Sequence, residues 1–169
     1  MVFAAVAFAS TNLCISAQGN KKKTKNADNF SWVSPTSEWK AKSLPKNVRH
    51  ATFKSPSMGI DVGYYVYLPD GYDAQKNKNK KYPVVYHLHG GRPGSESKTV
   101  SLATFIDKAM RSGKIQHTVY VFPNGGPMSW YNYSQVKNGQ GEDVFIKEMI
   151  PHVDATYRTF GTRAKRGIQ

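Results

Sequence analysis

The chain has 169 residues, of which 39% are hydrophobic, and its formal net charge is +13 at pH 7. This length and apolar content suit a single globular domain with its own core and exclude wholesale disorder. The positive charge raises the question of an acidic partner, but many of the lysines lie in two polar stretches with Asn in or beside them, 20–26 and 76–81, and no aromatic residue is interleaved. Because nucleic-acid-binding segments use aromatic rings to stack on bases, we interpret these stretches as solvated loops and expect no nucleic-acid partner.

Residues 1–17 are predicted to be a signal peptide. They are apolar, too short to span a bilayer, and end in small residues that suit signal peptidase. No basic residues precede the apolar run, so a helix packed on the domain stays as an alternative. The expected localisation is secreted or periplasmic. The single cysteine, Cys14, lies in this segment, so the mature chain is expected to have neither a disulfide nor a thiol nucleophile.

Two further regions follow the apolar segment. Residues 18–47 are rich in Lys, Asn and Ser, and we expect a linker that partly wraps the domain through Trp32 and Trp39. The folded domain is expected over residues 48–169.

Five strands are predicted in this domain. The first two, at 49–54 and 61–68, are joined by a short turn and form an antiparallel hairpin. Continuous apolar runs at 82–88 and 118–122 are typical of strands covered on both faces. Residues 165–169 begin a fifth strand.

Two helices are predicted between the later strands. Apolar residues at helical spacing indicate them at 99–112 and 142–157. Pro151 should kink or divide the second helix, because its ring removes a backbone donor and crowds the preceding turn. A hairpin that leads into alternating strands and helices predicts an α/β fold with a mixed, mostly parallel sheet flanked by helices.

The sequence His89-Gly90-Gly91 leaves the end of the buried strand at 82–88. Ligands of open α/β sheets bind beyond the carboxyl ends of the strands. Glycines allow the backbone to turn sharply and to present an N–H group to the negative oxygen of a tetrahedral intermediate. The motif therefore predicts half of an oxyanion hole, and the alternative is a glycine turn without catalytic duty.

Two other interpretations of this stretch are weaker. Lys98 and Thr99 resemble the end of a phosphate-binding loop, but Ser97 occupies a position that needs glycine. His87 and His89 would share one strand face, as metal ligands can, but no third ligand follows at suitable spacing. We expect neither a metal nor a cofactor.

Several segments between about His50 and Gln169 match a known family. They are YYVYLPDGYD (64–73), YPVVYHLHGG (82–91), VFPNG and SWYNYS (121–134), EDVFIKEMIPHVDATYRT (142–159) and RGIQ (166–169). On these segments the chain resembles the putative-esterase family of α/β-hydrolases, which includes feruloyl and acetyl-xylan esterases, S-formylglutathione hydrolases, enterochelin esterases and mycolyltransferases. The resemblance implies the N-terminal half of an α/β-hydrolase fold, a serine carboxylic ester hydrolase, and a backbone N–H of Gly91 that is an oxyanion donor.

The nucleophile expected from this resemblance does not occur in the sequence. No GxSxG motif is present, since Ser95 and Ser129 both lack the required glycines. In the family the serine elbow follows the fifth strand, so the nucleophile and the other triad members are expected beyond Gln169, and the 169 residues alone are expected to be inactive. Trp130 and Tyr131 match a family segment near the acyl pocket and are candidate substrate-binding residues, with packing at the sheet edge as the alternative.

The expected substrate is a small-molecule or polysaccharide-linked ester. The alternative function is a non-catalytic carbohydrate- or protein-binding module that uses Trp130, Tyr131 and Tyr133 as a stacking surface. A GxSxG motif in the coding region after Gln169 would favour the esterase.

Overall fold

The computed structural model describes residues 30–35 and 44–169. Their five strands form one sheet in the order β1-β2-β4-β3-β5. β1 pairs antiparallel with β2, and β2 antiparallel with β4, whereas β4, β3 and β5 run parallel. The mixed sheet and its N-terminal hairpin confirm the predicted α/β architecture. The strands are β1 (Val48–Lys54), β2 (Asp61–Tyr67), β3 (Val84–Tyr86), β4 (Val119–Pro123) and β5 (Arg166–Ile168).

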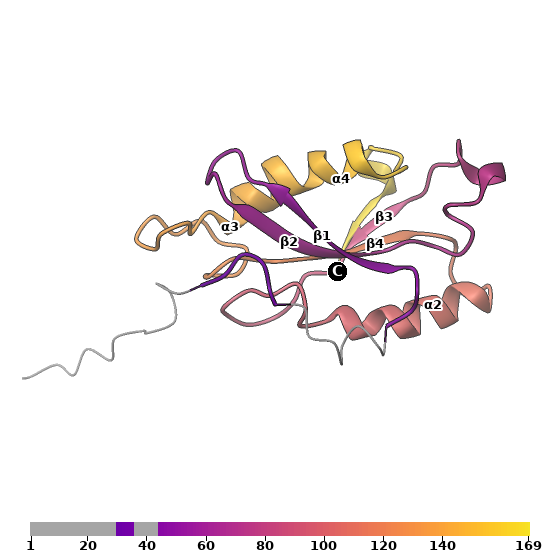
Figure 1. Ribbon diagram of the computed structural model, residues 1–169, viewed down its shortest axis with the longest axis horizontal. Coiled ribbons are helices and arrows are strands. Elements are labelled where there is room, and N and C mark those ends of the chain that lie inside the picture. Colours follow the sequence, from indigo (N-terminus) through magenta and orange to yellow (C-terminus); the bar gives the residue numbers. More distant parts are fainter. Residues whose placement is uncertain (1–29, 36–43) are drawn as a thin grey trace, which may run out of the picture.

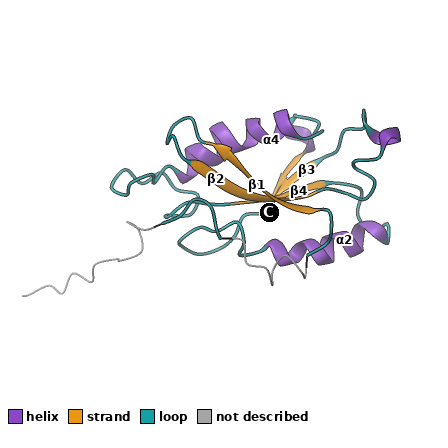
Figure 2. Cartoon of the chain, in the orientation of Figure 1, coloured by secondary structure: helices purple, strands orange, loops and turns teal. Residues whose placement is uncertain are grey.

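Helices cover both faces of this sheet (Figure 1). The α2 helix (Ala103–Arg111) lies on one face, after the 3₁₀ turn η2 (Val100–Leu102). A longer helical segment lies on the other face, as the colouring by secondary structure shows (Figure 2). It consists of α3 (Gly141–Asp143), the π-helical segment η3 (Val144–Met149) and α4 (Ile150–Thr156). Short 3₁₀ turns occur in the connections at η1 (Gln75–Asn77) and η4 (Arg163–Lys165).

Pro151 does not divide the second helix. The chain is helical from Gly141 to Thr156, and the hydrogen-bond pattern changes from α to π over Val144–Met149, which ends two residues before the proline. Pro151 lacks the N–H that an α-helix requires and its ring crowds the carbonyl of the preceding turn. The irregularity therefore falls in the turn where this crowding acts, and the helix continues through it.

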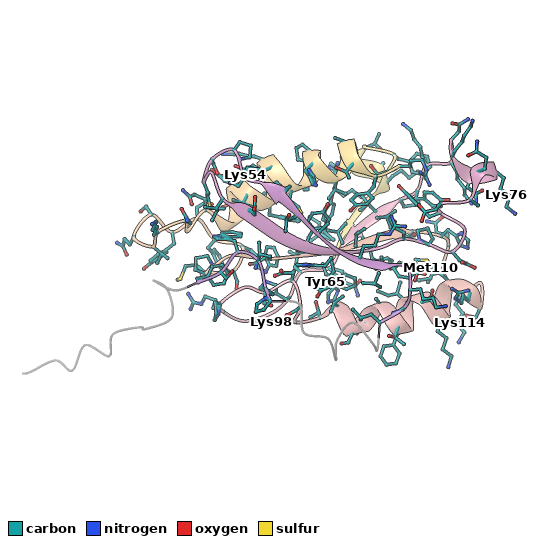
Figure 3. The ribbon with its side chains drawn as sticks, viewed as in Figure 1. Lys54, Tyr65, Lys76, Lys98, Met110 and Lys114 are labelled. Carbon is teal, nitrogen blue, oxygen red and sulfur yellow. The ribbon has the colours of Figure 1, made fainter. Side chains whose placement is uncertain are left out.

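The core lies in two layers, one on each face of the sheet. Alternate residues of a strand point to opposite faces. Tyr64 and Val66 of β2 accordingly pack toward the α3–α4 side, whereas Tyr65 packs with Met110 of α2. Figure 3 shows Tyr65 and Met110 in the layer between the sheet and α2. Burial on both faces explains why β2 is almost wholly apolar or aromatic.

Residues 30–35 pack on the domain. The Trp32 side chain is 3% exposed and belongs to the core on the α3–α4 side. Its carbonyl accepts a hydrogen bond of 2.7 Å from the N–H of Gly63 in β2. Trp39 and the predicted signal peptide lie outside the described residues, so the predicted linker is described only in part. Across residues 30–35 and 44–169, no helix has the length and apolarity needed to cross a membrane.

Candidate active site

A pocket of about 630 Å³ lies beyond the carboxyl ends of β3 and β4. Two loops line it, through residues 89–92 after β3 and residues 128–133 after β4. The predicted His89-Gly90-Gly91 turn and the predicted Trp130 and Tyr131 therefore meet at one site, although about 40 residues of sequence separate them. This is the sheet edge at which open α/β folds bind their ligands.

Gly91 has the backbone conformation of a tight turn, with φ of +73°. A side chain would be strained in this left-handed region, which accounts for the glycine. The Gly91 carbonyl accepts a hydrogen bond from the hydroxyl of Ser129. Its N–H donates no hydrogen bond to any of the described residues. Gly91 therefore lines the pocket with a backbone donor that the sheet does not use.

His89 fixes the shape of this turn. Its side chain is buried, and its Nε2 accepts hydrogen bonds from the N–H of Ser95 at 3.2 Å and of Gly125 at 3.0 Å. Two N–H donors on Nε2 place the ring proton on Nδ1. Burial lowers the pKa of His89 to about 4, so the ring is neutral near pH 7. With its acceptor nitrogen occupied, His89 ties the two pocket loops together.

Lys98, which the sequence placed in a possible phosphate loop, also supports the turn. Its Nζ donates hydrogen bonds to the carbonyls of Gly90 at 3.3 Å and Pro93 at 2.6 Å. Figure 3 shows Lys98 on the side of the sheet that α2 covers. The described residues contain no group of three His, Cys, Asp or Glu side chains that could hold a metal ion.

The two loops touch through their glycines. The N–H of Gly94 donates a hydrogen bond of 2.6 Å to the carbonyl of Gly126. A Cβ on Gly94 would lie 2.5 Å from the nitrogen of Gly126, and a Cβ on Gly125 would lie 2.7 Å from Nε2 of His89. These positions exclude side chains because backbone meets backbone or a buried ring. Sequence patterns did not predict this requirement, for which the only signal was the density of glycines in both loops.

Trp130 and Tyr131 have different environments. Trp130 is half-buried; its Nε1 donates to the carbonyl of His89 at 3.0 Å, and its ring packs edge-on against Phe145 with centroids 5.5 Å apart. Tyr131 is 69% exposed and Tyr133 is 42% exposed. The ring of Trp130 thus supports the wall of the pocket, while Tyr131 and Tyr133 present free ring surface at its rim.

The backbone that carries Trp130 is strained. Ser129 and Trp130 have φ of +42° and +60°, and neither is glycine. Two consecutive left-handed residues are costly and persist only where the surroundings hold them. The hydrogen bonds of Ser129 to Gly91 and of Trp130 to His89 do so here. These bonds connect both strained residues to the glycine turn.

Among residues 30–35 and 44–169, neither the Ser95 hydroxyl nor the Ser129 hydroxyl is hydrogen-bonded to a histidine ring. The Ser129 hydroxyl is bonded to the carbonyl of Gly91, and the Ser95 hydroxyl lies 2.8 Å from the hydroxyls of Ser34 and Ser97. Without a base within hydrogen-bond reach, neither hydroxyl is activated for attack.

The carboxyl end of β5 lies next to the glycine turn. The N–H of Gln169 donates to the carbonyl of Tyr86 at 3.0 Å, and the N–H of Leu88 donates to the carbonyl of Gln169 at 2.7 Å. Leu88 immediately precedes His89. Residue 169 therefore sits at the edge of the sheet where the pocket opens.

A sequence profile of the family described as "Putative esterase" matches residues 55–168, about two thirds of the chain. The chain belongs to this esterase family. The match starts in the β1–β2 turn and extends to the end of β5, so it includes both loops of the pocket.

Relatives of this chain include proteins named as esterases and as ferulic acid or feruloyl esterases. An esterase of Mycobacterium tuberculosis is 29% identical over 119 residues, which are 69% of this chain and 25% of that protein. A ferulic acid esterase structure superposes with a TM-score of 0.59 at 29% identity, covering 72% of this chain and 48% of that one. A mutant of the feruloyl esterase module from Clostridium thermocellum, solved with sinapinate, superposes with a TM-score of 0.53 at 28% identity, covering 80% of this chain and 49% of that one.

These superpositions confirm the α/β-hydrolase fold class. The chain spans about half the length of the esterase structures it matches and a quarter or less of the curated relatives.

Proposed function

We propose that the protein of which these 169 residues form the N-terminal part is a serine carboxylic ester hydrolase. In this proposal the present chain contributes one half of the oxyanion hole and one wall of the acyl pocket. The serine, its histidine base and the acidic residue lie outside the 169 residues. The serine attacks the ester carbonyl, histidine transfers the proton to the leaving alcohol, and the N–H of Gly91 donates to the oxyanion.

The observation that carries this proposal is the position of Gln169 beside the turn. An oxyanion hole needs donors close to the carbon that the nucleophile attacks. The hydrogen bonds between Leu88, Tyr86 and Gln169 bring the end of β5 to the same sheet edge as Gly91, whose N–H is unpaired among the described residues. A serine on a turn shortly after Gln169 would stand over the pocket.

The rim of the pocket supports an aromatic acyl group. Tyr131 and Tyr133 expose their rings, and stacking of one aromatic ring on another adds to the energy of burial. Ferulate and sinapinate, which are named for the related structures, are planar aromatic acids of this kind. Two curated relatives are named as an endo-1,4-beta-xylanase and an endo-1,4-beta-xylanase/feruloyl esterase, so we infer a polysaccharide-linked ester as substrate. The apolar N-terminal stretch supports secretion.

The experiment starts from the coding sequence after Gln169 and compares two expressed proteins. The longer protein should hydrolyse p-nitrophenyl acetate and methyl ferulate, and replacing the serine of its GxSxG motif by alanine should abolish turnover. The 169-residue chain should be slower by about a million-fold, the loss typical of a missing triad nucleophile.

Two outcomes would contradict the esterase. One is a reading frame that continues without a serine elbow. The other is a longer protein that binds xylan without hydrolysing either ester, which would support the binding-module alternative.

A further inference from the structure

Glu96 is a fully buried carboxylate. It is not part of the His89-Gly90-Gly91 motif and has no role in the proposed mechanism. It lies in the loop after β3, and the residue is 1% exposed. Room for it is made by Gly63 of β2, where a Cβ would come within 2.3 Å of Glu96 Oε1. A buried charge is costly unless donors surround it, so its presence calls for a reason.

Four donors from three segments saturate the Glu96 carboxylate. Oε1 accepts from the N–H of Ser34 at 2.7 Å and lies 3.0 Å from Nε2 of His50 on β1. Oε2 accepts from the hydroxyl of Ser34 at 2.8 Å and from Nδ2 of Asn124 at 2.9 Å. Burial raises the pKa of Glu96, but the bonds from His50 and Ser34 outweigh it and hold the pKa below its usual value. The carboxylate is therefore ionised near pH 7.

The bond to Asn124 connects Glu96 to the second pocket loop. Asn124 directly follows β4, and its Oδ1 accepts a hydrogen bond of 2.9 Å from the N–H of Gly126. The carbonyl of Gly126 in turn accepts the 2.6 Å bond from Gly94, two residues before Glu96. The bonds from Glu96 through Asn124 and Gly126 to Gly94 form a closed ring across the two loops. Its geometry fixes the spacing of the loops that line the pocket.

We propose that Glu96 is a positioning residue of the oxyanion pocket, which sets the location of the Gly91 N–H by holding the glycine loop against the loop after β4. This inference rests on the proposed esterase function. Glu96 touches no substrate in this account. It acts through Asn124 and the Gly94–Gly126 contact.

The test replaces Glu96 by glutamine in the longer protein. Glutamine has the same shape, but its amide nitrogen donates and must replace one carboxylate oxygen, so two of the four accepted hydrogen bonds are lost and the contact between the loops is weakened. A displacement of the reacting groups by about 1 Å costs about 100-fold in rate. We expect kcat on p-nitrophenyl acetate to fall about 100-fold while KM changes less than about threefold, the pattern of an interaction made only in the transition state.

Glu148→Gln is the matched control. Glu148 also accepts a serine hydroxyl and a backbone N–H, from Ser55 at 2.6 Å and Ser57 at 3.1 Å, but it lies outside the pocket. Glu148→Gln should leave kcat unchanged.

Ser34→Ala is an intermediate variant. It removes the hydroxyl donor and leaves the Glu96 carboxylate and its bond from the Ser34 N–H in place. It should lower kcat by about three- to tenfold, an effect between those of Glu148→Gln and Glu96→Gln.

The outcomes separate the inference from the function. If the unaltered longer protein is inactive, the proposed function fails and this inference fails with it. If that protein is active and Glu96→Gln matches Glu148→Gln in kcat, the inference alone is overturned. Should Glu96→Gln not fold, Ser34→Ala decides: a kcat equal to that of the unaltered protein refutes the positioning role.

Discussion

The substitution Gly94→Ala is the sharpest test of the close contact between the two pocket loops. The added Cβ would lie 2.5 Å and 2.6 Å from the nitrogen and oxygen of Gly126 and 2.8 Å from the nitrogen of Gly125. All three neighbours are backbone atoms, so no rotamer change relieves the overlap. Restoring the ordinary contact distance of 3.4 Å requires the loops to separate by 0.9 Å, the difference between 3.4 Å and 2.5 Å.

This separation also breaks a hydrogen bond. The 2.6 Å bond from Gly94 to Gly126 would lengthen to about 3.5 Å, where it contributes little. Losing it costs about 1 kcal/mol and overpacking costs a further 1–3 kcal/mol, so the free energy of unfolding should fall by about 2–4 kcal/mol. For a domain of this size, a loss of about 3 kcal/mol lowers Tm by about 6–12 °C.

The assay is urea unfolding followed by tryptophan fluorescence, since Trp32 and Trp130 both contact these loops. Gly90→Ala is the control, because a Cβ there meets nothing within 4 Å. It should be neutral or stabilising by about 0.5 kcal/mol. Gly91→Ala should fall between the two at about 1 kcal/mol, since the space is open but φ is +73°. Equal unfolding midpoints for Gly94→Ala and Gly90→Ala would refute the close contact.

Two further predictions concern His89 and the aromatic residues. Burial lowers the pKa of His89 to about 4, so protonation of this ring favours the unfolded chain. The contribution of neutral His89 to the free energy of unfolding should be fully present above about pH 6.5 and should be lost as the pH falls toward 4. Burial also lowers the pKa of His152, so His89→Gln should weaken the pH dependence without abolishing it. If the urea midpoints of His89→Gln and of the unaltered protein vary identically between pH 4 and 7, the buried neutral state of His89 is contradicted. Trp130→Ala should destabilise the fold by about 3 kcal/mol, whereas Tyr131→Ala should change stability by less than about 0.5 kcal/mol and raise KM for methyl ferulate in the longer protein. Calorimetry and steady-state kinetics separate these two effects, and a strongly destabilised Tyr131→Ala would count against its place on the rim.

The arrangement of the fold could be predicted from local patterns. Continuous apolar runs identified β3 and β4, and the order of strands and helices gave the mixed sheet. The π-helical segment before Pro151 could not be predicted, because proline excludes the regular pattern without specifying what replaces it. Trp32 was predicted to pack on the domain, but its contact with Gly126 could not be predicted, since it joins residues more than 90 positions apart.

The candidate site was predictable only at its strand end. His89, Gly90 and Gly91 follow a recognisable buried strand, so their position beyond the sheet followed from topology. Glu96 carried no signal, because a single glutamate in a polar loop is usually solvated. Its burial depends on donors from Ser34, His50 and Asn124, and nothing in the sequence shows that these three residues meet.

The oxyanion role of Gly91 can be tested by the structure of the longer protein after reaction with an ester-like phosphonate. Such a reagent leaves a tetrahedral phosphorus on the nucleophilic serine, with one oxygen where the oxyanion forms. We expect this oxygen to lie about 2.7–3.1 Å from the backbone nitrogen of Gly91, in the pocket between the two loops. A phosphonate bound to a serine whose oxygen points away from Gly91 would contradict it, and so would a reagent that labels no serine at all.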